Sequence, residues 1–471
     1  MITSTSPRPL AAALFGVVLM AGTASAADPN FKYVDLGTLG GEQAAAFGLN
    51  DARQVVGWST IPGCTTALGA PCRRAFLWDD GVMTDLGLLA GDEESTARAI
   101  NNAGLVVGTS ESDVTAGFGV YHAFEWNGSM SPLPDLGSGQ SWVNDVNNSG
   151  LMVGYATDPS VTRDRVVTWQ SGAITNMGAS EGHSYNRGYG LSDGGLLAGF
   201  AWNLFSPNDA ILFAGGWVTI GGFGQFQNAE ASDVNDNGTA CGLMAFPSGN
   251  WHAALWTQVE AIDLGVLPGM DLGNLSDVNE AGHAVGSSYT DVASRAIYYD
   301  GETMRDLNEL LPAGVDVLLW EANEINENGD IAGVALVNGA FRAFLLMNEP
   351  WVDLGGGTAG INGVPTLEAT GPLVAGSDLT LELTDAPSNA LMAGWLSLAS
   401  TPVPALGGTL HATPNVLQLL VFANGSGEWT QSLSWPAGVP MGTEPTVQFI
   451  VQDVSVPAQI TLSNGVMATT P

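Results

Sequence analysis

The sequence predicts an all-β fold: a seven-bladed β-propeller of four-stranded blades, followed by a small C-terminal β-sandwich. Three observations predict it. A motif recurs about every 45 residues between residues 31 and 350, which is the period of a propeller blade. Each unit is typical of short strands separated by turns, and the repeat stops near Gly356. The expected boundaries are 1–26 for a signal peptide, 27–355 for the propeller and 356–471 for the sandwich.

The first 26 residues have the features of a signal peptide. Arg8 precedes an apolar stretch from Leu10 to Gly22, and Ala24-Ser25-Ala26 forms a cleavage site of the A-x-A type. The apolar stretch is too short to span a bilayer, and no longer one follows. We therefore expect a secreted protein, extracellular or held at a bacterial cell surface, without a transmembrane segment in the mature chain.

The net charge argues against one class of partner, and the cysteines indicate an oxidising compartment. The chain has 471 residues, with 47 acids against 12 bases and a formal net charge of −35. Such a chain lacks the clustered cations that bind a phosphate backbone, so no nucleic-acid partner is expected. Cys64 and Cys72 lie in one loop and can form a disulfide in an oxidising compartment. Cys241 aligns with Val or Ala in the other units, which predicts a small buried residue.

Three positions define the repeat. An Asn-x-x-Gly turn begins at Asn50, Asn101, Asn147, Ser192, Asn235, Asn279 and Asn326. A glycine closes the next apolar pair at Gly57, Gly108, Gly154, Gly199, Gly242, Gly286 and Gly333. An aromatic position holds Trp78, Trp126, Trp169, Phe213, Trp256, Tyr299 and Leu346, for which core packing is favoured over a sugar platform.

Two segments could provide the fourth strand of the seventh blade. The segment from Phe31 to Gly37 and the segment from Trp351 to Gly355 both contain the Asp-Leu-Gly of a fourth strand. Only one can occupy that edge. We favour the N-terminal copy, because pairing the first strand with the last blade closes the ring and removes an exposed edge.

The units resemble the HAF family of extracellular repeats, named for a His-Ala-Phe triplet. The triplet is intact at His122-Ala123-Phe124 and altered at Arg74-Ala75-Phe76, Arg342-Ala343-Phe344 and His252-Ala253-Ala254. The resemblance covers about two-thirds of the chain. It implies an exported bacterial protein, and it implies no activity. The fourth unit departs most from the pattern, with Ser192, Asp209 and Phe213.

The residue before the Ala of the triplet is usually a cation. The seven are Arg74, His122, Arg165, Asp209, His252, Arg295 and Arg342, and the matching positions in the next Asp-Leu-Gly are Asp85, Asp135, Asn176, Thr219, Asp263, Asp306 and either Asp353 or Asp35. An anion-binding ring is one interpretation, and a cross-strand ion pair is the other. The ion pair is favoured, because the acid becomes Thr219 where the cation becomes Asp209.

Two motifs carry possible chemistry. Residues 233–238 match the first half of a calcium loop, and residues 145–150 match it less well, but Cys241 and Met244 stand where later ligands belong. Hairpin turns explain these residues, so no metal or other cofactor is assigned and calcium stays an alternative. Residues 178–182 match G-x-S-x-G beside His183, without the strand–turn–helix context of a nucleophile elbow. We therefore assign no catalytic residue, and the binding residues stay unknown.

Two functions remain. The first is a non-catalytic binding or cell-surface scaffold for an unknown extracellular ligand, a polysaccharide or a surface protein, with the insertions Thr60–Pro71, Glu111–Tyr121 and Asn203–Asn208 as the binding loops. The alternative is a calcium-assisted extracellular hydrolase or lyase on a polymer substrate. It needs acids that converge at one mouth of the ring, which a sequence cannot show. The C-terminal module is expected to dock, to retain the protein at a surface or to act as a spacer.

Overall fold

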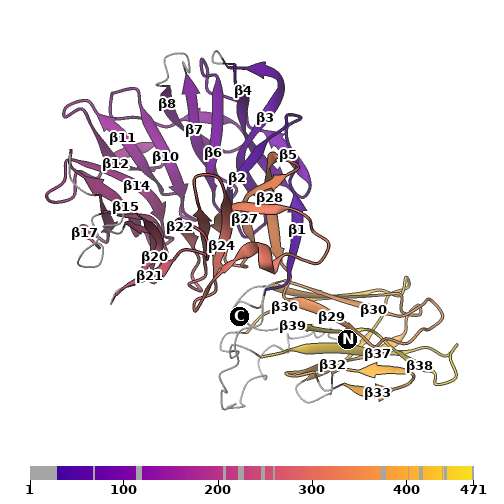
Figure 1. The fold of residues 1–471 in the computed structure, drawn as a ribbon. Helices are drawn as coiled ribbons and strands as arrows, with labels where there is room; N and C mark the ends of the chain where they lie inside the picture. The colour runs from indigo at the N-terminus through magenta and orange to yellow at the C-terminus, as the bar shows by residue number, and fades with distance from the viewer. Residues whose placement is uncertain are drawn as a thin grey trace, which may run out of the picture. The chain divides into compact units, whose positions relative to one another are not determined.

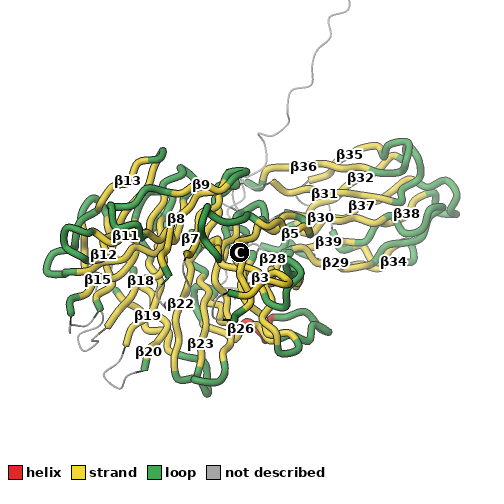
Figure 2. The backbone as a smooth tube through the Cα atoms, turned by 90° about the horizontal axis from the view of Figure 1, so that it is seen from above, coloured by secondary structure: helices red, strands yellow, loops and turns green. Residues whose placement is uncertain are grey.

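The computed structural model describes residues 29–471 except 67–68, 113–118, 205–207, 221–227, 246–249, 258–259, 372, 374–377, 401, 413–416, 437–438, 440–442 and 469–471. The predicted signal peptide therefore lies outside the described residues. Residues 31–348 form one compact unit, and residues 349–471 belong to a second. Strands and loops make up nearly all of both, as Figure 2 shows. The predicted all-β fold is confirmed.

The first unit contains seven antiparallel sheets of four strands each. In chain order, the first three are β2 (Ala44–Leu49), β3 (Val55–Thr65), β4 (Pro71–Asp79) and β5 (Val82–Asp85); β6 (Glu94–Ile100), β7 (Val106–Ser112), β8 (Val120–Trp126) and β9 (Met130–Pro132); β10 (Ser141–Val146), β11 (Met152–Asp158), β12 (Arg163–Gln170) and β13 (Ala173–Asn176). The next three are β14 (Tyr185–Leu191), β15 (Leu197–Trp202), β16 (Asp209–Phe213) and β17 (Trp217–Thr219); β18 (Asn228–Val234), β19 (Ala240–Ala245), β20 (Trp251–Trp256) and β21 (Ala261–Gly265); β22 (Leu272–Val278), β23 (Ala284–Tyr289), β24 (Ser294–Tyr299) and β25 (Met304–Asp306). The seventh is β26 (Leu318–Ile325), β27 (Ile331–Val337), β28 (Ala340–Asn348) and β1 (Phe31–Asp35), and a short 3-10 turn, η2 (Leu307–Leu310), precedes it.

The seven sheets, which we call blades 1 to 7, pack one on the next around a ring. The first strand of each blade contacts the first strands of both neighbouring blades, and β26 of blade 7 contacts β2 of blade 1. A buried apolar cluster crosses the same junction, with Ala46 and Phe76 of blade 1 packed with Ala343 and Leu345 of blade 7. The first strands therefore form a closed inner circle, which is the arrangement predicted for a seven-bladed propeller.

The N-terminal strand completes blade 7. β1 pairs antiparallel with β28 from Phe31 opposite Asn348 to Asp35 opposite Phe344, and Figure 1 shows the two side by side. The rival segment is β29 (Trp351–Gly355), which pairs with β39 (Gly465–Ala468) of the second unit. The boundary after residue 355 was therefore placed too late. The ring ends at Asn348, because the strand that follows has its partner in the second unit.

The second unit contains two packed sheets, as predicted for a sandwich. One sheet has the order β29-β39-β37-β32-β35, with β38 beside β37, and the other has the order β30-β31-β36. Leu381 and Leu383 of the smaller sheet pack with Met392, Phe449 and Val451 of the larger one in a single buried cluster. The remaining bounds are β30 (Thr366–Thr370), β31 (Asp378–Thr384), β32 (Leu391–Ser397), β35 (Leu417–Phe422), β36 (Trp429–Ser434), β37 (Thr446–Gln452) and β38 (Ile460–Leu462), with a hairpin of β33 (Val403–Ala405) and β34 (Gly408–Leu410).

The repeated glycine permits a close approach of two strands. Each inner strand has a β-bulge before its last two residues, and the glycine of the second strand lies opposite that bulge. A Cβ added at Gly154 would lie 1.9 Å from the carbonyl oxygen of Trp142, and one at Gly333 would lie 2.1 Å from that of Glu321. Any side chain would push the strands apart, so all seven units have glycine.

The repeated asparagine ties each blade to the next. The Asn101 Nδ2 donates to the carbonyl oxygen of Asn147 at 3.0 Å, and its Oδ1 accepts from the backbone N–H of Leu105 within its own turn. The same bond to the next blade forms from Asn50, Asn147, Asn235, Asn279 and Asn326, the last donating to Asn50 and closing the circle. The motif that predicted a turn is therefore also the main polar link between blades.

Blade 4 has Ser192 in place of this asparagine and provides a natural control. The Ser192 Oγ accepts from the backbone N–H of Leu196, so the hydroxyl replaces the bond within the turn. Among the described residues the hydroxyl makes no bond to blade 5, and the turn is joined to that blade by the backbone N–H of Gly194, which donates to Asp236. Other turns make such a backbone link in addition to the amide link, as where the Asp51 N–H donates to Asn102. A serine therefore keeps the turn and gives up the link.

An Asn101→Ser variant should isolate the contribution of that link. It leaves the buried carbonyl of Asn147 without its donor, which should lower the free energy of unfolding by about 1–3 kcal/mol. Urea unfolding measures this, with Asn127→Ser, an exposed hairpin position, as the matched control that should change by less than about 0.5 kcal/mol. Equal effects of the two changes would mean that the amide ring is not a stabilising element.

Candidate functional site

The inner circle has two ends that differ in character. Every inner strand begins at one end and finishes at its asparagine turn at the other, because all seven run in the same sense. We call the end formed by the seven turns the turn mouth. The opposite end, where β10 begins at Ser141 and β14 at Tyr185, is the insertion mouth, because the predicted binding loops join second to third strands there. Residues 67–68, 113–118 and 205–207 of those loops lie outside the described residues.

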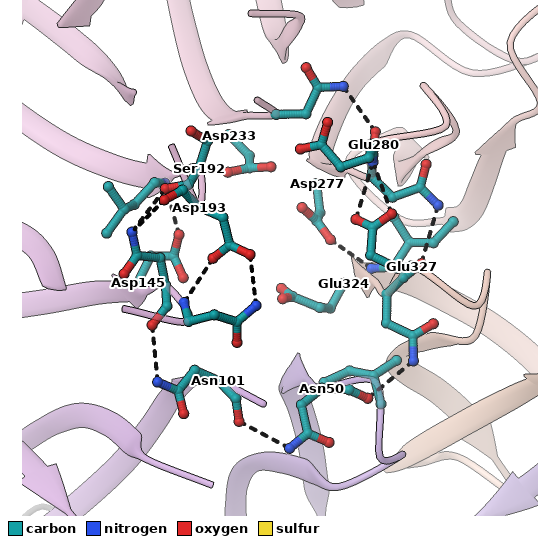
Figure 3. A pocket seen from close by; sticks show the side chains of 18 of the residues that line it. Asn50, Asn101, Asp145, Ser192, Asp193, Asp233, Asp277, Glu280, Glu324 and Glu327 are labelled. Atoms are coloured by element: carbon teal, nitrogen blue, oxygen red, sulfur yellow. Dashed lines mark hydrogen bonds between the residues drawn. The ribbon is translucent and has the colours of Figure 1, made fainter. Parts of the chain in front are cut away.

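A pocket of about 190 Å³ lies at the turn mouth, on the axis of the ring (Figure 3). All seven turns contribute to its lining. The acids among the lining residues are Asp51, Asp145, Asp193, Asp233, Asp236, Asp277, Glu280, Glu324 and Glu327, and no base accompanies them. Acidic side chains therefore converge at this mouth of the ring, which the sequence alone could not show.

Three of these carboxyl groups are bound to the backbone of the following blade. The backbone N–H of Leu191 donates to Asp145 at 2.8 Å and that of Ile325 donates to Asp277 at 2.7 Å. Asp233 accepts from Val278 in the same way, at 3.4 Å. Like the asparagine links, these bonds join a side chain of one blade to the backbone of the next, although here the side chain accepts the hydrogen bond. They give the aspartates a structural reason to be there, so the pocket by itself does not indicate catalysis.

Protein surrounds these carboxyl groups, although the pocket leaves part of each accessible. Burial raises the pKa of Asp145 from 3.8 to about 7, and the charge of Asp233 adds to the increase. Burial, Glu324 and Asp233 together raise the pKa of Asp277. Burial raises the pKa of Asp233 as well. The cluster therefore binds protons more tightly than isolated carboxyl groups do.

The calcium-loop match at residues 233–238 does not place its oxygens together. The Asn235 Oδ1 accepts from the backbone N–H of Thr239, its Nδ2 donates to Asn279, and the Asn237 Nδ2 donates to Glu280. Among the described residues, no group of three or more His, Cys, Asp or Glu side chains is arranged to hold a metal ion. Hydrogen bonds of a turn account for the motif.

The G-x-S-x-G motif takes part in an unexpected constellation. The Ser180 Oγ lies 3.0 Å from His183 Nδ1, and His183 Nε2 lies 2.8 Å from Asp209 Oδ2. The residue types are those of a serine hydrolase, in which the serine must be reachable and the aspartate buried. Here the burial is reversed, with Ser180 3% exposed and the Asp209 side chain 43% exposed. Ser180 therefore cannot meet a substrate, and the line of three is a structural contact.

The His183–Asp209 contact also explains the departure of blade 4 from the repeat. In blade 2 the cation position holds His122, which contacts Asp92 of the preceding connection at 3.1 Å. In blade 4 the same position holds Asp209, and the preceding connection supplies the histidine. The acid and the histidine have therefore changed places, and a histidine–aspartate pair still joins the third strand to the preceding connection. The compensation that the sequence suggested between Asp209 and Thr219 therefore involves His183 instead.

The predicted hairpin ion pair forms in three of the seven blades. His252 pairs with Asp263 at 2.9 Å, Arg295 with Asp306 at 3.7 Å and Arg342 with Asp35 at 3.2 Å. The last pair again joins the N-terminal strand to blade 7. Arg74 does not contact Asp85: its Nη1 donates to the carbonyl oxygen of Glu93, so the prediction was wrong for blade 1.

The other predicted positions are structural. The aromatic repeat position is in the core at Trp169, which is 0% exposed, and at Trp256, which is 2% exposed. Cys241 is buried, and burial raises the pKa of its thiol. The structure joins Cys64 and Cys72 in a disulfide with the Cα atoms 5.4 Å apart.

A different set of rings lines the inner strands toward the insertion mouth. Trp142 of β10 stacks on Tyr155 of β11 at 4.7 Å, and Tyr185 of β14 stacks on Trp202 of β15 at 5.0 Å. The Arg187 guanidinium lies between the two stacks, 4.5 Å from the Tyr155 ring and 5.4 Å from the Trp202 ring. Blades 3 and 4 thus form a continuous wall of rings around a fixed cation.

Two glutamates project from inner strands of other blades. Glu230 of β18 accepts a hydrogen bond from Asn208 Nδ2 and lies in the field of Arg187. Glu321 of β26 has no hydrogen-bond partner among the residues that the structure describes, and burial alone raises its pKa. Burial raises the pKa of the Tyr289 phenol of β23, and the charges of Glu321 and Glu230 add to the increase. The three residues come from the successive blades 5, 6 and 7. We call Arg187, Glu230, Tyr289 and Glu321 the inner-wall site.

Sequence reasoning missed this site because its residues do not repeat. The bulged residue of each inner strand is Phe47, Arg98, Asn144, Tyr189, Ser232, Ser276 or Asn323, and the residue two places before it varies as widely. The variation itself was the available signal. Within a strongly repeated unit, positions that are free to differ are those the fold does not require.

Comparison with known proteins gives distant structural neighbours. A scan against protein-family models and a search of curated protein sequences find no match. Among solved structures, a prolyl endopeptidase matches at 13% identity and a TM-score of 0.44, over 74% of this chain and 56% of that chain. A Trypanosoma rangeli sialidase matches at 8% identity and a TM-score of 0.33, over 95% and 96%. An acylaminoacyl peptidase of Pyrococcus horikoshii matches at 9% identity and 0.34, over 62% and 58%.

The prediction of a non-catalytic scaffold is corrected, because the ring brings together carboxyl groups that the sequence left scattered. The matched chains are enzymes, but TM-scores of 0.33 to 0.44 decide nothing about the function of this chain. The HAF resemblance stays a prediction, since no family model matches. No helix in the described part of the chain is long and apolar enough to cross a membrane.

The pocket acids predict how stability depends on pH. A carboxyl group whose pKa is higher in the folded state binds protons more tightly when folded, so the unfolding free energy falls as pH rises. For Asp145 the fall should extend from about pH 4 to about pH 7, and each tenfold difference in proton affinity between the folded and unfolded states corresponds to about 1.4 kcal/mol. Asp145→Asn keeps an oxygen for the Leu191 N–H and cannot ionise, so this variant should lose less stability over that interval.

Urea unfolding at pH 5 and pH 8 tests this expectation. Asp271→Asn is the matched control, because Asp271 is exposed. Parallel pH profiles for wild type and Asp145→Asn would show that Asp145 ionises as it does in the unfolded chain.

Proposed function

We propose that the protein is a hydrolase of an extracellular polymer and that the inner-wall site carries the reaction. Glu321 is the proton donor and Glu230 the base. This proposal replaces the prediction of a non-catalytic scaffold. It keeps the hydrolase that the sequence analysis gave as the alternative function, but it does not require calcium.

The observation that supports the proposal most directly is the difference between the two glutamates. Nothing in the described structure stabilises a negative charge on Glu321, and burial raises its pKa. Burial also raises the pKa of Glu230, but the Asn208 hydrogen bond and Arg187 lower it. The pKa of both carboxyl groups is raised, but only Glu230 has partners that favour its ionised form. Acid–base hydrolysis needs two carboxyl groups in unlike surroundings.

The roles follow from these environments. Protonated Glu321 can give its proton to the oxygen of the bond that breaks, which makes that oxygen a better leaving group. Ionised Glu230 can take a proton from the attacking water. Hydrolysis of glycosidic bonds uses a pair of carboxyl groups in this way. The rings of blades 3 and 4 would hold the repeating units of the polymer beside the pair.

Other features agree with an extracellular substrate. The N-terminal segment has the pattern of a signal peptide, and the Cys64–Cys72 disulfide suits an oxidising compartment. An acidic, Lys-poor chain favours polymers other than nucleic acids. We therefore propose that the protein is secreted.

Glutamine substitutions test the proposal. Glu321→Gln keeps the size of the side chain and removes the proton donor, which should lower turnover about 10²- to 10⁴-fold. Glu230→Gln should lower it by a similar factor. The assay measures new reducing ends from a panel of neutral and acidic polysaccharides, across a pH series. The wild-type rate should fall as pH rises through the pKa of Glu321, because the acid form is lost.

Glu302→Gln is the matched control, since Glu302 is exposed on the hairpin between β24 and β25. It should leave turnover unchanged. If the wild type releases no reducing ends from the whole panel, or if Glu321→Gln is as active as wild type, the proposed site is wrong.

A further inference from the structure

Glu324 occupies a position that all seven blades share. It is the last residue but one of β26, directly after the bulge. The same position holds Asp145, Asp233 and Asp277 in blades 3, 5 and 6, and Gly48, Ala99 or Gly190 in the other three. Four blades therefore carry a carboxyl group at one level of the inner circle, and all four residues line the turn-mouth pocket.

The three aspartates use their carboxyl groups to join blades, whereas Glu324 does not. Each aspartate accepts the backbone N–H of the last residue of the next inner strand, which is Leu191, Val278 or Ile325. The matching donor for Glu324 would be Leu49 of blade 1. Among the residues that the structure describes, Glu324 accepts no hydrogen bond, and its carboxyl group points toward the middle of the pocket (Figure 3). The longer side chain thus leaves the link between blades unmade and reaches toward the axis of the ring.

The pocket gives Glu324 neighbours of its own sign. Acids line it and no base does. Surrounding protein buries the Glu324 carboxyl group, and burial together with the charges of Asp145 and Asp233 raises its pKa. A carboxylate that has lost hydration without gaining a partner is costly. A cation in the pocket would offset both the lost hydration and the repulsion.

The pocket has room for such a cation together with its water. Its volume is about 190 Å³, whereas a single water needs only about 10–15 Å³ of such space. Among the described residues, no three acidic side chains are arranged to hold a bare metal ion. Mg²⁺ keeps several waters and binds through one or two carboxylates, whereas Ca²⁺ takes about six to eight oxygens. A hydrated ion therefore fits this spacing better than an ion enclosed by protein ligands.

We propose that the turn-mouth pocket binds one hydrated divalent cation, preferentially Mg²⁺, with Glu324 as its direct ligand. The waters of the ion donate hydrogen bonds to Asp145, Asp233 and Asp277, which keep their bonds to the backbone. The ion thereby connects blades 3, 5, 6 and 7 across the axis and stabilises the closed ring. The proposal does not depend on the hydrolase, whose site lies toward the opposite mouth, so either can fail without the other.

Titration of the full chain with MgCl₂, after removal of metal by EDTA and dialysis, tests the inference. Calorimetry should find one Mg²⁺ per chain. At 100 times its dissociation constant, Mg²⁺ should raise the melting temperature by about 3–4 °C. NaCl of equal ionic strength should raise it by less than about 1 °C, because diffuse screening does not replace a bound ion.

Two substitutions separate the reach of Glu324 from its charge. Glu324→Gln removes the charge and should weaken Mg²⁺ binding at least about 10-fold. Glu324→Asp keeps the charge but is one methylene shorter, as in blades 3, 5 and 6, and should also weaken binding at least about 10-fold. Without metal, Glu324→Gln should melt no lower than wild type, because one source of repulsion is gone, and this separates the lost binding from a folding defect.

Glu302→Gln, on an exposed hairpin, is the matched control and should change the affinity less than about twofold. If NaCl stabilises as much as MgCl₂, or if several ions bind each chain with similar affinity, the acids attract diffuse counter-ions only and the site is wrong. Wild-type affinity in Glu324→Asp would show that net charge, and not the reach of Glu324, holds the ion. Tighter binding of Ca²⁺ than of Mg²⁺ would overturn the water-completed shell. A metal-free Glu324→Gln that melts below metal-free wild type would show that the carboxyl group is already stabilised by the protein.

Discussion

The amide of one asparagine in each of six blades holds the ring together at its centre. A propeller blade cannot bury both of its faces alone, so the fold depends on how blades join. The Asn50 Nδ2 donates to the carbonyl of Asn101, and the Asn326 Nδ2 donates to that of Asn50, so the links continue across the junction of the last and first blades. Each amide satisfies a buried carbonyl that would otherwise lose its hydration. Arg53 adds an ion pair with the buried Asp330 at the junction of the first and last blades.

This construction explains why the conspicuous pocket and the proposed site lie at opposite ends. The links require seven turns to meet around the axis, which crowds their polar side chains into one small space. Aspartates there accept backbone hydrogen bonds from the next blade, as Asp145 does from Leu191. The bulge above each turn points a side chain toward the axis without a role in these links. The inner strands are therefore free to differ at the bulge, where Arg98 lies, and two residues before it, where Glu230 and Glu321 lie.

Blade 4 shows how the repeat tolerates change where it departs most. Ser192 keeps its turn and loses the amide link, while the backbone link from Gly194 to Asp236 is kept. Gly190 leaves room for Asp233 of blade 5, because a Cβ at that position would lie 2.4 Å from the Asp233 Cα. The same blade supplies Arg187 and Tyr185 to the inner wall. A blade that depends less on the common links thus carries more of the unusual side chains.

The sequence by itself determined the fold class and the number of repeated units. Those features follow from local patterns: a turn every 45 residues or so, a glycine opposite each bulge, and apolar residues in short runs. It could not determine the site. Glu230 and Glu321 are 91 residues apart in the chain, and nothing in their own segments relates them. Closing the ring brings β18 and β26 to the same axis, where Glu230 has a hydrogen bond from Asn208 and Glu321 has none among the described residues. Ser180, His183 and Asp209 show the converse. Their types suggest catalysis, and only the tertiary structure shows that the serine is buried and the aspartate exposed.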